Sequence, residues 1–405
     1  MSFNIALSGM NAATANLGVI SNNIANANTT GFKSSRSEFA DLITSGNQAL
    51  QALDTGGGVV SSATRQSYNQ GTIQFTDNAM DLAISGSGFF TINRGGVEHY
   101  TRDGSFQVNA EGFLVTSQGD RLQGFAPLAG GGFNTAEFTD LQLSTQESAP
   151  QMTSEVTAAL NLPADAEVPT VAAFDPADPD SYNHATSVTV FDSLGAPHAA
   201  TLYFSQTATE NEWTMNVAID GTDIGSPTPV TFDNTGAITA PAGGLVTFAG
   251  LTIGTGTAAQ DISLDLSSAT QFGSTFAVSD ISQDGFANGQ LNGVEFTSSG
   301  ILQARYSNGQ TVELGQVALS NFRNLDGLQA AGENAWRATP EAGAVRRGEA
   351  GTGDFGSLRS GALEASNVDL TEQLVSMITA QRSFQANSQV ITTMDQITQA
   401  ALQLR

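Results

Sequence analysis

The chain has 405 residues and carries 39 acidic against 14 basic side chains, for a formal net charge of −25. This length allows two to four domains. The acidity argues against binding to a nucleic-acid backbone or to an anionic membrane surface, because both need clustered cations. There is no cysteine, which excludes disulfides and thiolate metal sites. No apolar run is long enough to predict insertion into a membrane.

The N-terminal segment is predicted to be a helix with a seven-residue apolar repeat. Its two lines of apolar positions are Phe3, Met10, Leu17 and Ile24, and Ala6, Ala13, Ile20 and Ala27. Such spacing is typical of a coiled-coil seam. Gly31 follows the pattern and is expected to mark the helix stop. The side chains before Lys33, the only lysine, are all uncharged. A cationic signal-peptide segment is therefore missing, and we expect export without a cleaved signal.

The C-terminal segment shows a second, less regular seam. Its apolar positions are Leu370, Leu374, Met377, Phe384, Ile391 and Met394. Ser366 or Asn367 is expected to cap this helix, with Asp369 and Glu372 well placed for the helix dipole. Two helices alone bury only a narrow seam. An intramolecular helix pair remains one interpretation, and contact with other copies of the chain is the other.

The middle of the chain is predicted to be β structure. Short alternating strands are separated by turn signals such as Arg94-Gly95-Gly96, and hairpin turns are expected at Asn292-Gly293 and Asn308-Gly309. Between Arg121 and Arg305 there are twenty acidic residues and no Lys or Arg. This stretch is expected to be a solvated outer module. The expected fold is therefore mainly β, with paired terminal coiled-coil-like helices that carry nested β-domains.

The expected domains follow this order. They are a terminal helical polymerisation domain (1–32 and 362–405), a connecting segment (33–70), an inner β-domain (71–145 and 285–361) and an acidic outer β-domain (146–284). Within the last part of the inner domain, 343–361 is expected to be a linker.

Candidate chemical sites are few. Asp175, Asp178 and Asp180 could suggest a calcium loop, but prolines interrupt them and the twelfth-position Glu is missing, so a solvated loop is favoured. No nucleophile–base signature surrounds the three histidines. We therefore expect no catalytic, cofactor-binding or metal site.

Three stretches resemble bacterial flagellar rod and hook proteins. The first is "SNNIANANTTGFK", the second is the "ASNVDL" stretch with the helix that follows it, and the third is "YTRDGSFQVNAEGF". The signature residues of the two end stretches are Asn22, Asn26, Asn28, Gly31, Phe32, Lys33, Ser366, Asn367 and Val368. The acidic middle looks like the outer domain found in hook subunits, so a hook subunit is expected.

The resemblance implies a self-polymerising subunit of a flexible, curved tube that transmits torque from rod to filament. Its implied partners are further copies, the rod and hook–filament junction proteins, the hook cap and the export apparatus, at an extracellular place in the flagellar hook and basal body. Two alternatives stay open. One is a distal rod-type axial protein, and the other is a secreted acidic β-rich binding protein or adhesin.

Overall fold

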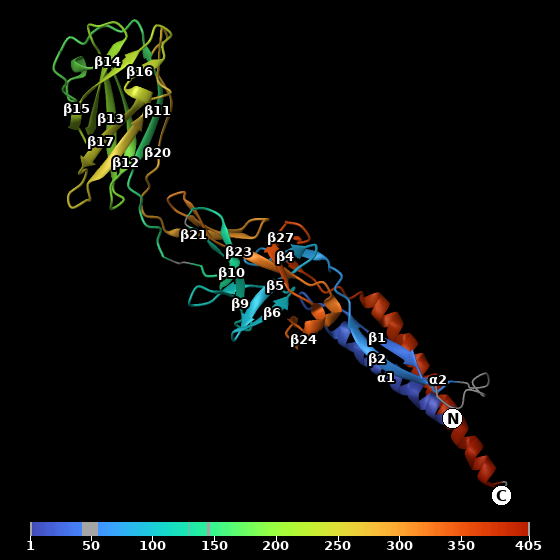
Figure 1. The fold of residues 1–405 in the computed structure, drawn as a ribbon. Helices are drawn as coiled ribbons and strands as arrows, with labels where there is room; N and C mark the ends of the chain where they lie inside the picture. The colour runs from blue at the N-terminus through green and yellow to red at the C-terminus, as the bar shows by residue number, and fades with distance from the viewer. Residues whose placement is uncertain (1, 43–55, 129, 144–145, 404–405) are drawn as a thin grey trace. The chain divides into compact units, whose positions relative to one another are not determined.

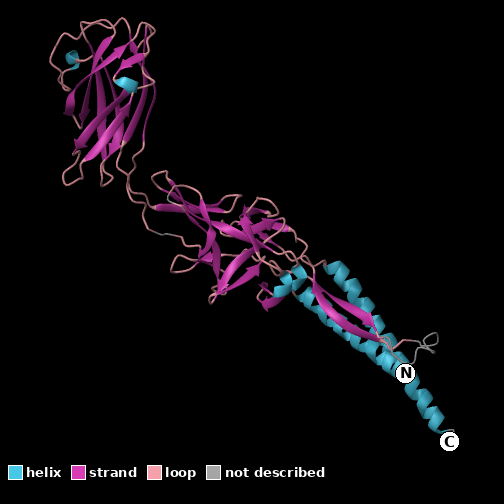
Figure 2. Cartoon of the chain, viewed as in Figure 1, coloured by secondary structure: helices cyan, strands magenta, loops and turns pink. Residues whose placement is uncertain are grey.

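The computed structural model describes residues 2–42, 56–128, 130–143 and 146–403 and is mainly β, with a long α-helix near each end of the chain (Figure 2). The chain divides into two compact units. Unit 1 comprises residues 1–145, 293–305 and 311–405, and unit 2 comprises residues 146–292 and 306–310. None of the described helices is long and apolar enough to cross a membrane. The prediction of a mainly β chain with a helix at each end is confirmed.

The helical part of unit 1 has three members. Helix α1 (Ser2–Ala25) lies antiparallel to α2 (Leu370–Gln403), and a hairpin of β1 (Ser35–Asp41) and β2 (Val59–Gln66) runs along α1 (Figure 1). Ser8 of α1 accepts a hydrogen bond from the Val59 backbone N–H at 3.1 Å. The hairpin therefore supplies the layer that a pair of helices lacks. The hairpin lies within the connecting segment predicted for 33–70, where no strands were expected, and 43–55 lie outside the described residues.

The β part of unit 1 is built on one large sheet and two small ones. The large sheet runs β21-β22-β23-β9-β5-β6-β25-β24, with β10, β26, β7 and β8 pairing beside this path. Its strands are β5 (Phe89–Arg94), β6 (Val97–Thr101), β7 (Gln107–Val108), β8 (Leu114–Val115), β9 (Arg121–Pro127), β10 (Phe133–Asp140), β21 (Leu291–Phe296), β22 (Ile301–Tyr306), β23 (Thr311–Asn321), β24 (Leu328–Gly332), β25 (Ala335–Ala338) and β26 (Arg346–Glu349). The small sheets pair β3 (Ile73–Phe75) with β28 (Ala362–Glu364), and β4 (Leu82–Ser85) with β27 (Ser357–Ser360).

Several predicted turns and one predicted linker can be compared with the structure. The turn at Gly95 and Gly96 joins β5 to β6, and Asn308-Gly309 joins β22 to β23, as expected. Asn292-Gly293 lies inside β21, so the hairpin turn predicted there is wrong. The linker predicted for 343–361 is also wrong, because β26 and β27 pair with β23 and β4. The glycine-rich sequence predicted a linker here, because its many glycines interrupt the alternation of side chains that identifies a strand.

Unit 2 is a sandwich of two five-stranded sheets. One sheet contains β11 (Glu155–Pro163), β17 (Leu245–Leu251), β18 (Gln260–Asp265), β19 (Thr270–Phe272) and β20 (Ala277–Gln283). The other runs in the order β12 (His184–Phe191), β13 (Pro197–Gln206), β14 (Glu212–Ile219), β15 (Thr222–Phe232) and β16 (Ile238–Ala240). Inward-facing residues of both sheets, such as Leu160, Leu264, Val190 and Trp213, form one buried core.

Candidate functional site: the base and faces of the terminal helices

The signature glycine lies where the N-terminal segment meets the β part of unit 1. After α1 ends at Ala25, a turn carries the chain to Gly31, whose φ is +68°. Its N–H donates to the Glu364 carbonyl at 2.8 Å. A Cβ added here would lie 2.5 Å from the Asp103 backbone nitrogen. The left-handed backbone and the close approach both require glycine.

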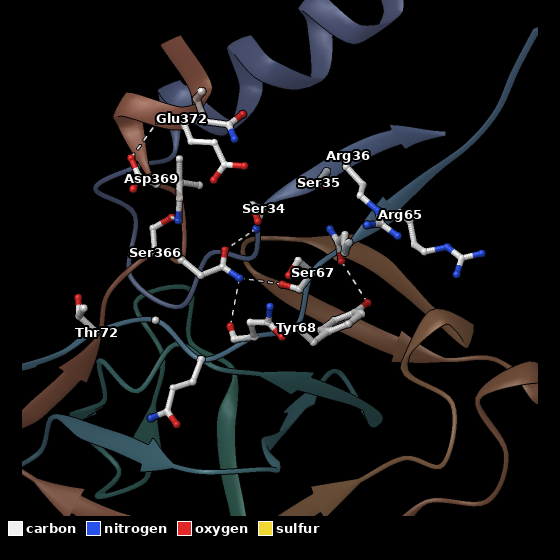
Figure 3. Close-up of a pocket in the computed structure, with 17 residues that line it drawn as sticks. Ser34, Ser35, Arg36, Arg65, Ser67, Tyr68, Thr72, Ser366, Asp369 and Glu372 are labelled. Atoms are coloured by element: carbon white, nitrogen blue, oxygen red, sulfur yellow. Dashed lines mark hydrogen bonds between the residues drawn. The ribbon is translucent and has the colours of Figure 1, made fainter. Parts of the chain in front are cut away.

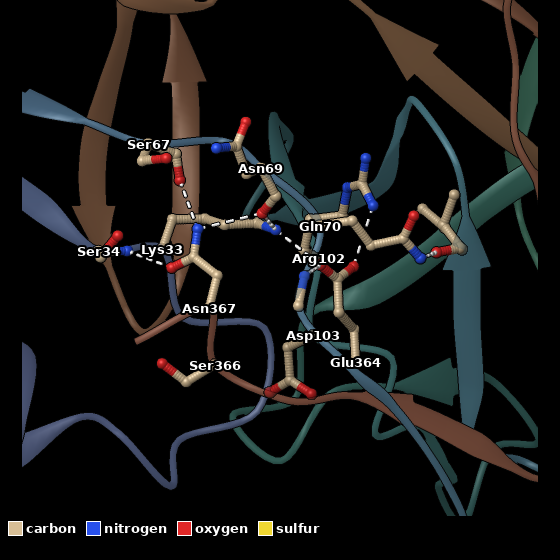
Figure 4. Close-up of polar contacts among 12 residues, drawn as sticks. Lys33, Ser34, Ser67, Asn69, Gln70, Arg102, Asp103, Glu364, Ser366 and Asn367 are labelled. Atoms are coloured by element: carbon tan, nitrogen blue, oxygen red, sulfur yellow. Dashed lines mark hydrogen bonds and ion pairs between the residues drawn. The ribbon is translucent and has the colours of Figure 1, made fainter. Parts of the chain in front are cut away.

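Next to Gly31 lies a buried cluster of three charged side chains, shown in Figure 4. Lys33 Nζ is 2.6 Å from Glu364 Oε1, and Arg102 Nη1 is 2.9 Å from Glu364 Oε2. All three side chains are at most 5 % exposed. Lys33 also donates to the Asn69 carbonyl at 2.7 Å, and Arg102 donates to the Gly86 carbonyl at 2.8 Å. This triad joins segments that are far apart in the chain.

Burial dominates the electrostatics of the triad. It lowers the pKa of Lys33 and that of Arg102, while the Glu364 carboxylate opposes both shifts. One carboxylate thus faces two cations, and each cation also donates to one backbone carbonyl, while Arg102 Nε is buried without a hydrogen-bond partner among the described residues. A buried charge is tolerated only when it is paired and hydrogen-bonded in this way. The triad therefore suits a structural joint.

The C-terminal signature is anchored to the same place. Asn367 accepts from the Ser34 N–H at 2.7 Å and donates to the Ser67 and Asn69 carbonyls at 2.8 and 3.1 Å (Figure 4). The cap of α2 is Asp369, whose Oδ1 accepts from the Thr371 and Glu372 N–H groups. The predicted capping role of Ser366 or Asn367 is therefore wrong. Asn367 instead clamps the two chain ends together.

Beside the anchored signature lies an open polar groove of about 940 Å³, shown in Figure 3. The residues that line it come from the hairpin, the 67–72 segment and the start of α2. They include Arg36, Arg65, Tyr68, Asp369 and Glu372. Burial, with a contribution from Asp326, raises the pKa of Tyr68 to about 12. Its hydroxyl remains protonated and donates to Gln66 Oε1 at 3.2 Å.

Small and polar residues form the contact between α1 and α2. A Cβ added at Gly9 would lie 2.8 Å from Asn387 Nδ2, so these residues are adjacent. At the other end, Asn23 donates to Gln373 Oε1 at 3.0 Å. Asn23 is buried and also bonds both the N–H and the carbonyl of Ser35. The two contacts lie fourteen positions apart on each helix, as a single antiparallel register requires.

The predicted seam residues divide into three groups by exposure. Ala6, Ala13 and Ile20 are buried, and the half-buried members are Met10, Leu17, Ile24, Ala27, Met377, Ile391 and Met394. Four seam residues are exposed, and they are Phe3 (51 %), Leu370 (45 %), Leu374 (47 %) and Phe384 (36 %). Within the chain, α2 meets α1 through Gln373 and Asn387, and Ala380 between them is buried. The sequence pattern did not identify Gln373 and Asn387 as contacts, because it followed only the apolar positions.

The remaining signature residues lie around the joint or outside it. Asn26 donates to the Asn22 carbonyl at 2.9 Å, and the Phe32 carbonyl accepts from Asn367. Asn28 is exposed, and Val368 lines the groove. Arg102 and Glu364 were missed as site residues. Arg102 stands in the "YTRDG" motif and Glu364 precedes "ASNV", but their pairing across 262 positions has no sequence signal.

Comparison with known proteins shows which family the chain belongs to. Four family models match: "Flagella basal body rod protein" at residues 3–33, "Flagellar hook protein FlgE/F/G D1 domain" at 83–173, "Flagellar basal body protein FlaE D2 domain" at 161–286 and "Flagellar basal body rod FlgEFG protein C-terminal" at 359–404. The flagellar hook protein FlgE of Salmonella typhimurium is 37 % identical over 100 % of both chains. The chain belongs to the flagellar hook protein family.

Other hook proteins agree with this assignment. The FlgE proteins of Rhizobium meliloti and Borreliella burgdorferi are each 34 % identical over 98 % of this chain, covering 97 % and 98 % of their own lengths. The Helicobacter pylori flagellar hook protein FlgE2 shares the fold, with a TM-score of 0.54 at 14 % identity over 72 % of this chain and 100 % of that one. The predicted hook subunit is confirmed, in preference to the distal rod-type and adhesin alternatives, and this hook protein is placed in the flagellum.

Proposed function

We propose that this hook subunit polymerises with copies of itself through the free apolar faces of α1 and α2. The observation that carries the proposal is that the paired helices keep large apolar side chains exposed. On α2 these are Leu370, Leu374, Val375, Ile378, Phe384, Val390 and Ile397, and on α1 they are Phe3 and Leu7. Contiguous exposed apolar surface is typical of protein–protein contact. The seam residues thus serve partly within the chain and partly between copies.

The roles of the other parts complete the proposal. The terminal regions 1–32 and 362–405 polymerise, the inner β-domain spaces the subunits, and the acidic outer domain stays in water. The polymer is a flexible curved tube that transmits torque between rod and filament. Its further partners are the rod and junction proteins, the hook cap and the apparatus that exports the chain to the cell exterior. The chain acts as a structural protein and not as an enzyme.

The test is a single substitution on the free face of α2. Leu374→Asp places a charge where an apolar contact between copies is proposed, and burying an unpaired charge is strongly unfavourable. We expect tube formation, followed by electron microscopy and sedimentation, to be lost. The folding of both units should be unchanged, because Leu374 is 47 % exposed in the chain itself.

Leu194→Asp is the matched control. It makes the same change at a leucine that is 66 % exposed in unit 2, outside the helical regions proposed to polymerise. This variant should still form tubes. Normal assembly by Leu374→Asp would contradict the proposal.

A further inference from the structure

Unit 2 has an unusual set of charges. It contains seventeen Asp and Glu residues and no Lys or Arg. His184 and His198 are therefore its only side chains that can become cationic near neutral pH. Burial lowers the pKa of His184, whose ring stacks on Phe276. This leaves His198 as the main source of positive charge in the unit.

His198 lies between two carboxylates that come from different hairpin ends. Its Nδ1 is 2.6 Å from Asp220 Oδ2, at the turn between β14 and β15. Its Nε2 is 3.3 Å from Asp192 Oδ2, at the turn between β12 and β13. The side chain of His198 is 14 % exposed and that of Asp192 is 4 % exposed. The imidazole thus bridges two turns of the same sheet.

Both carboxylates are held in place by the backbone. Asp192 Oδ1 accepts from the N–H groups of Leu194 and Ala196, each at 2.8 Å, and Asp220 Oδ1 accepts from the Ala199 N–H at 3.0 Å. A third segment packs against the cluster at Gly254, where an added Cβ would lie 3.0 Å from Asp192 Oδ2. That segment, residues 252–259, contains no ionisable side chain. Asp192 and Asp220 are therefore the charged groups that face His198.

We propose that Asp192, His198 and Asp220 form a proton-dependent clasp, which holds two turns of unit 2 together in mildly acidic solution and weakens as the solution becomes alkaline. When the imidazole is protonated, both ring nitrogens donate to carboxylates. When it is neutral, only one nitrogen can donate, and the other faces a carboxylate with no proton between them. The clasp is specific to unit 2 and independent of the helical assembly surface.

The direction of the pH effect follows from the contacts. The hydrogen bond to Asp220 raises the pKa of His198. Burial opposes this rise, and the hydrogen bond to Asp192 increases it. A raised pKa in the folded state means that the stabilisation is complete below the unfolded value of about 6.5 and is lost as pH rises through the folded value. The bond to His198 is the largest cause that lowers the pKa of Asp220. Burial alone would raise the pKa of Asp192, but the hydrogen bonds from the backbone and from His198 outweigh burial, so this pKa is lowered.

The first test is the titration of His198 itself in the full chain. With only three histidines present, selectively labelled imidazoles can be followed by NMR, and His198→Gln identifies the resonance. We expect a midpoint above about 6.5 that falls toward this value in Asp220→Asn. Asp223→Asn is the matched control. Asp223 is exposed and has no side-chain hydrogen bond or ion pair among the described residues. A wild-type midpoint at or below 6.5, or equal shifts in both Asn variants, would overturn the proposal.

The second test measures the stability of unit 2 as a function of pH, in the wild type and in one variant. The chain has two tryptophans, with Trp213 buried in unit 2 and Trp336 buried in unit 1. Fluorotryptophan labelling therefore gives one ¹⁹F signal for each unit. Between about pH 6 and 8.5 the carboxylates stay ionised, so the two histidines of unit 2 control the change in the Trp213 transition. His184, whose pKa burial lowers, adds stability as pH rises, and His198, whose pKa is raised, removes it. We expect its midpoint to fall with rising pH in the wild type, and to stay level or rise in His198→Gln. An unchanged slope in that variant would refute the clasp.

Discussion

At the scale of single residues, the triad of Lys33, Arg102 and Glu364 is the part of unit 1 where charged side chains are most deeply buried. A buried ion cluster gives little net stability, because desolvation offsets much of the Coulomb attraction. Removing Glu364, however, would leave both buried cations without a counter-charge. Glu364 is the critical member, since each of its carboxylate oxygens forms an ion pair with one cation. Its backbone carbonyl also accepts a hydrogen bond from the Gly31 N–H.

We therefore predict that Glu364→Gln destabilises unit 1 by about 3–5 kcal/mol. Denaturant unfolding followed at Trp336 gives the measurement, while the Trp213 transition of unit 2 should not move. Glu313→Gln is the control, because Glu313 is exposed on β23 and has no side-chain hydrogen bond or ion pair in the described part of the chain. Equal effects of the two substitutions would show that the triad contributes nothing particular.

At the scale of elements, α1 and α2 approach closely because small residues line their contact. Gly9 faces Asn387, whereas Gly18, on the same helix, has no atom within 4 Å of an added Cβ. The two glycines therefore have opposite roles. Gly9 provides space for the partner helix, and Gly18 only lowers the helix propensity of α1.

The two positions make a matched pair of substitutions. Gly9→Leu should push α2 away, so backbone amides near residues 9 and 387 should exchange with solvent at least several-fold faster. Gly18→Leu should slow exchange in α1 or leave it unchanged, since Leu favours the helix by up to about 1 kcal/mol over Gly. Hydrogen-exchange mass spectrometry of the full chain compares them. Similar exchange in the two variants would mean that Gly9 is not a contact.

At the scale of the whole molecule, charge is divided unequally between the units. All 14 basic residues lie in unit 1 with 22 acidic ones, which gives 14 − 22 = −8, whereas unit 2 carries −17 with neutral histidines. Each unit folds against its own repulsion, and unit 2 has almost no opposite charge to reduce it. The stability of unit 2 is therefore the more sensitive to screening by salt.

We predict that raising ionic strength from about 0.01 to 0.15 M, which shortens the Debye length from about 30 to 8 Å, stabilises unit 2 more than unit 1. The two ¹⁹F tryptophan signals report the two unfolding midpoints in one sample. The same experiment with sucrose, which is uncharged, is the control for general stabilisation. A larger salt effect at Trp336 than at Trp213 would contradict this prediction.

Sequence reasoning succeeded where a pattern is local and failed where a contact is distant. The seven-residue repeat located both helices, and the glycine turn signals located β5–β6 and β22–β23. The β1–β2 hairpin was missed, since its strands are largely exposed and show little alternation. Lys33 was found through a family signature, but its ion-pair partner Glu364 could not be inferred, because pairing across 331 positions depends on the folded topology.

The long separation within the triad also governs the order in which the chain can fold. Unit 2 lies within residues 146–310, so its sandwich is complete in the chain before residue 364 has been synthesised. The joint of unit 1 cannot close until Glu364 is present, because Lys33 and Arg102 otherwise lack their common carboxylate. Closing so long a loop is also slow compared with local pairing. The base of the helices is thus expected to remain open until nearly the whole polypeptide has been made.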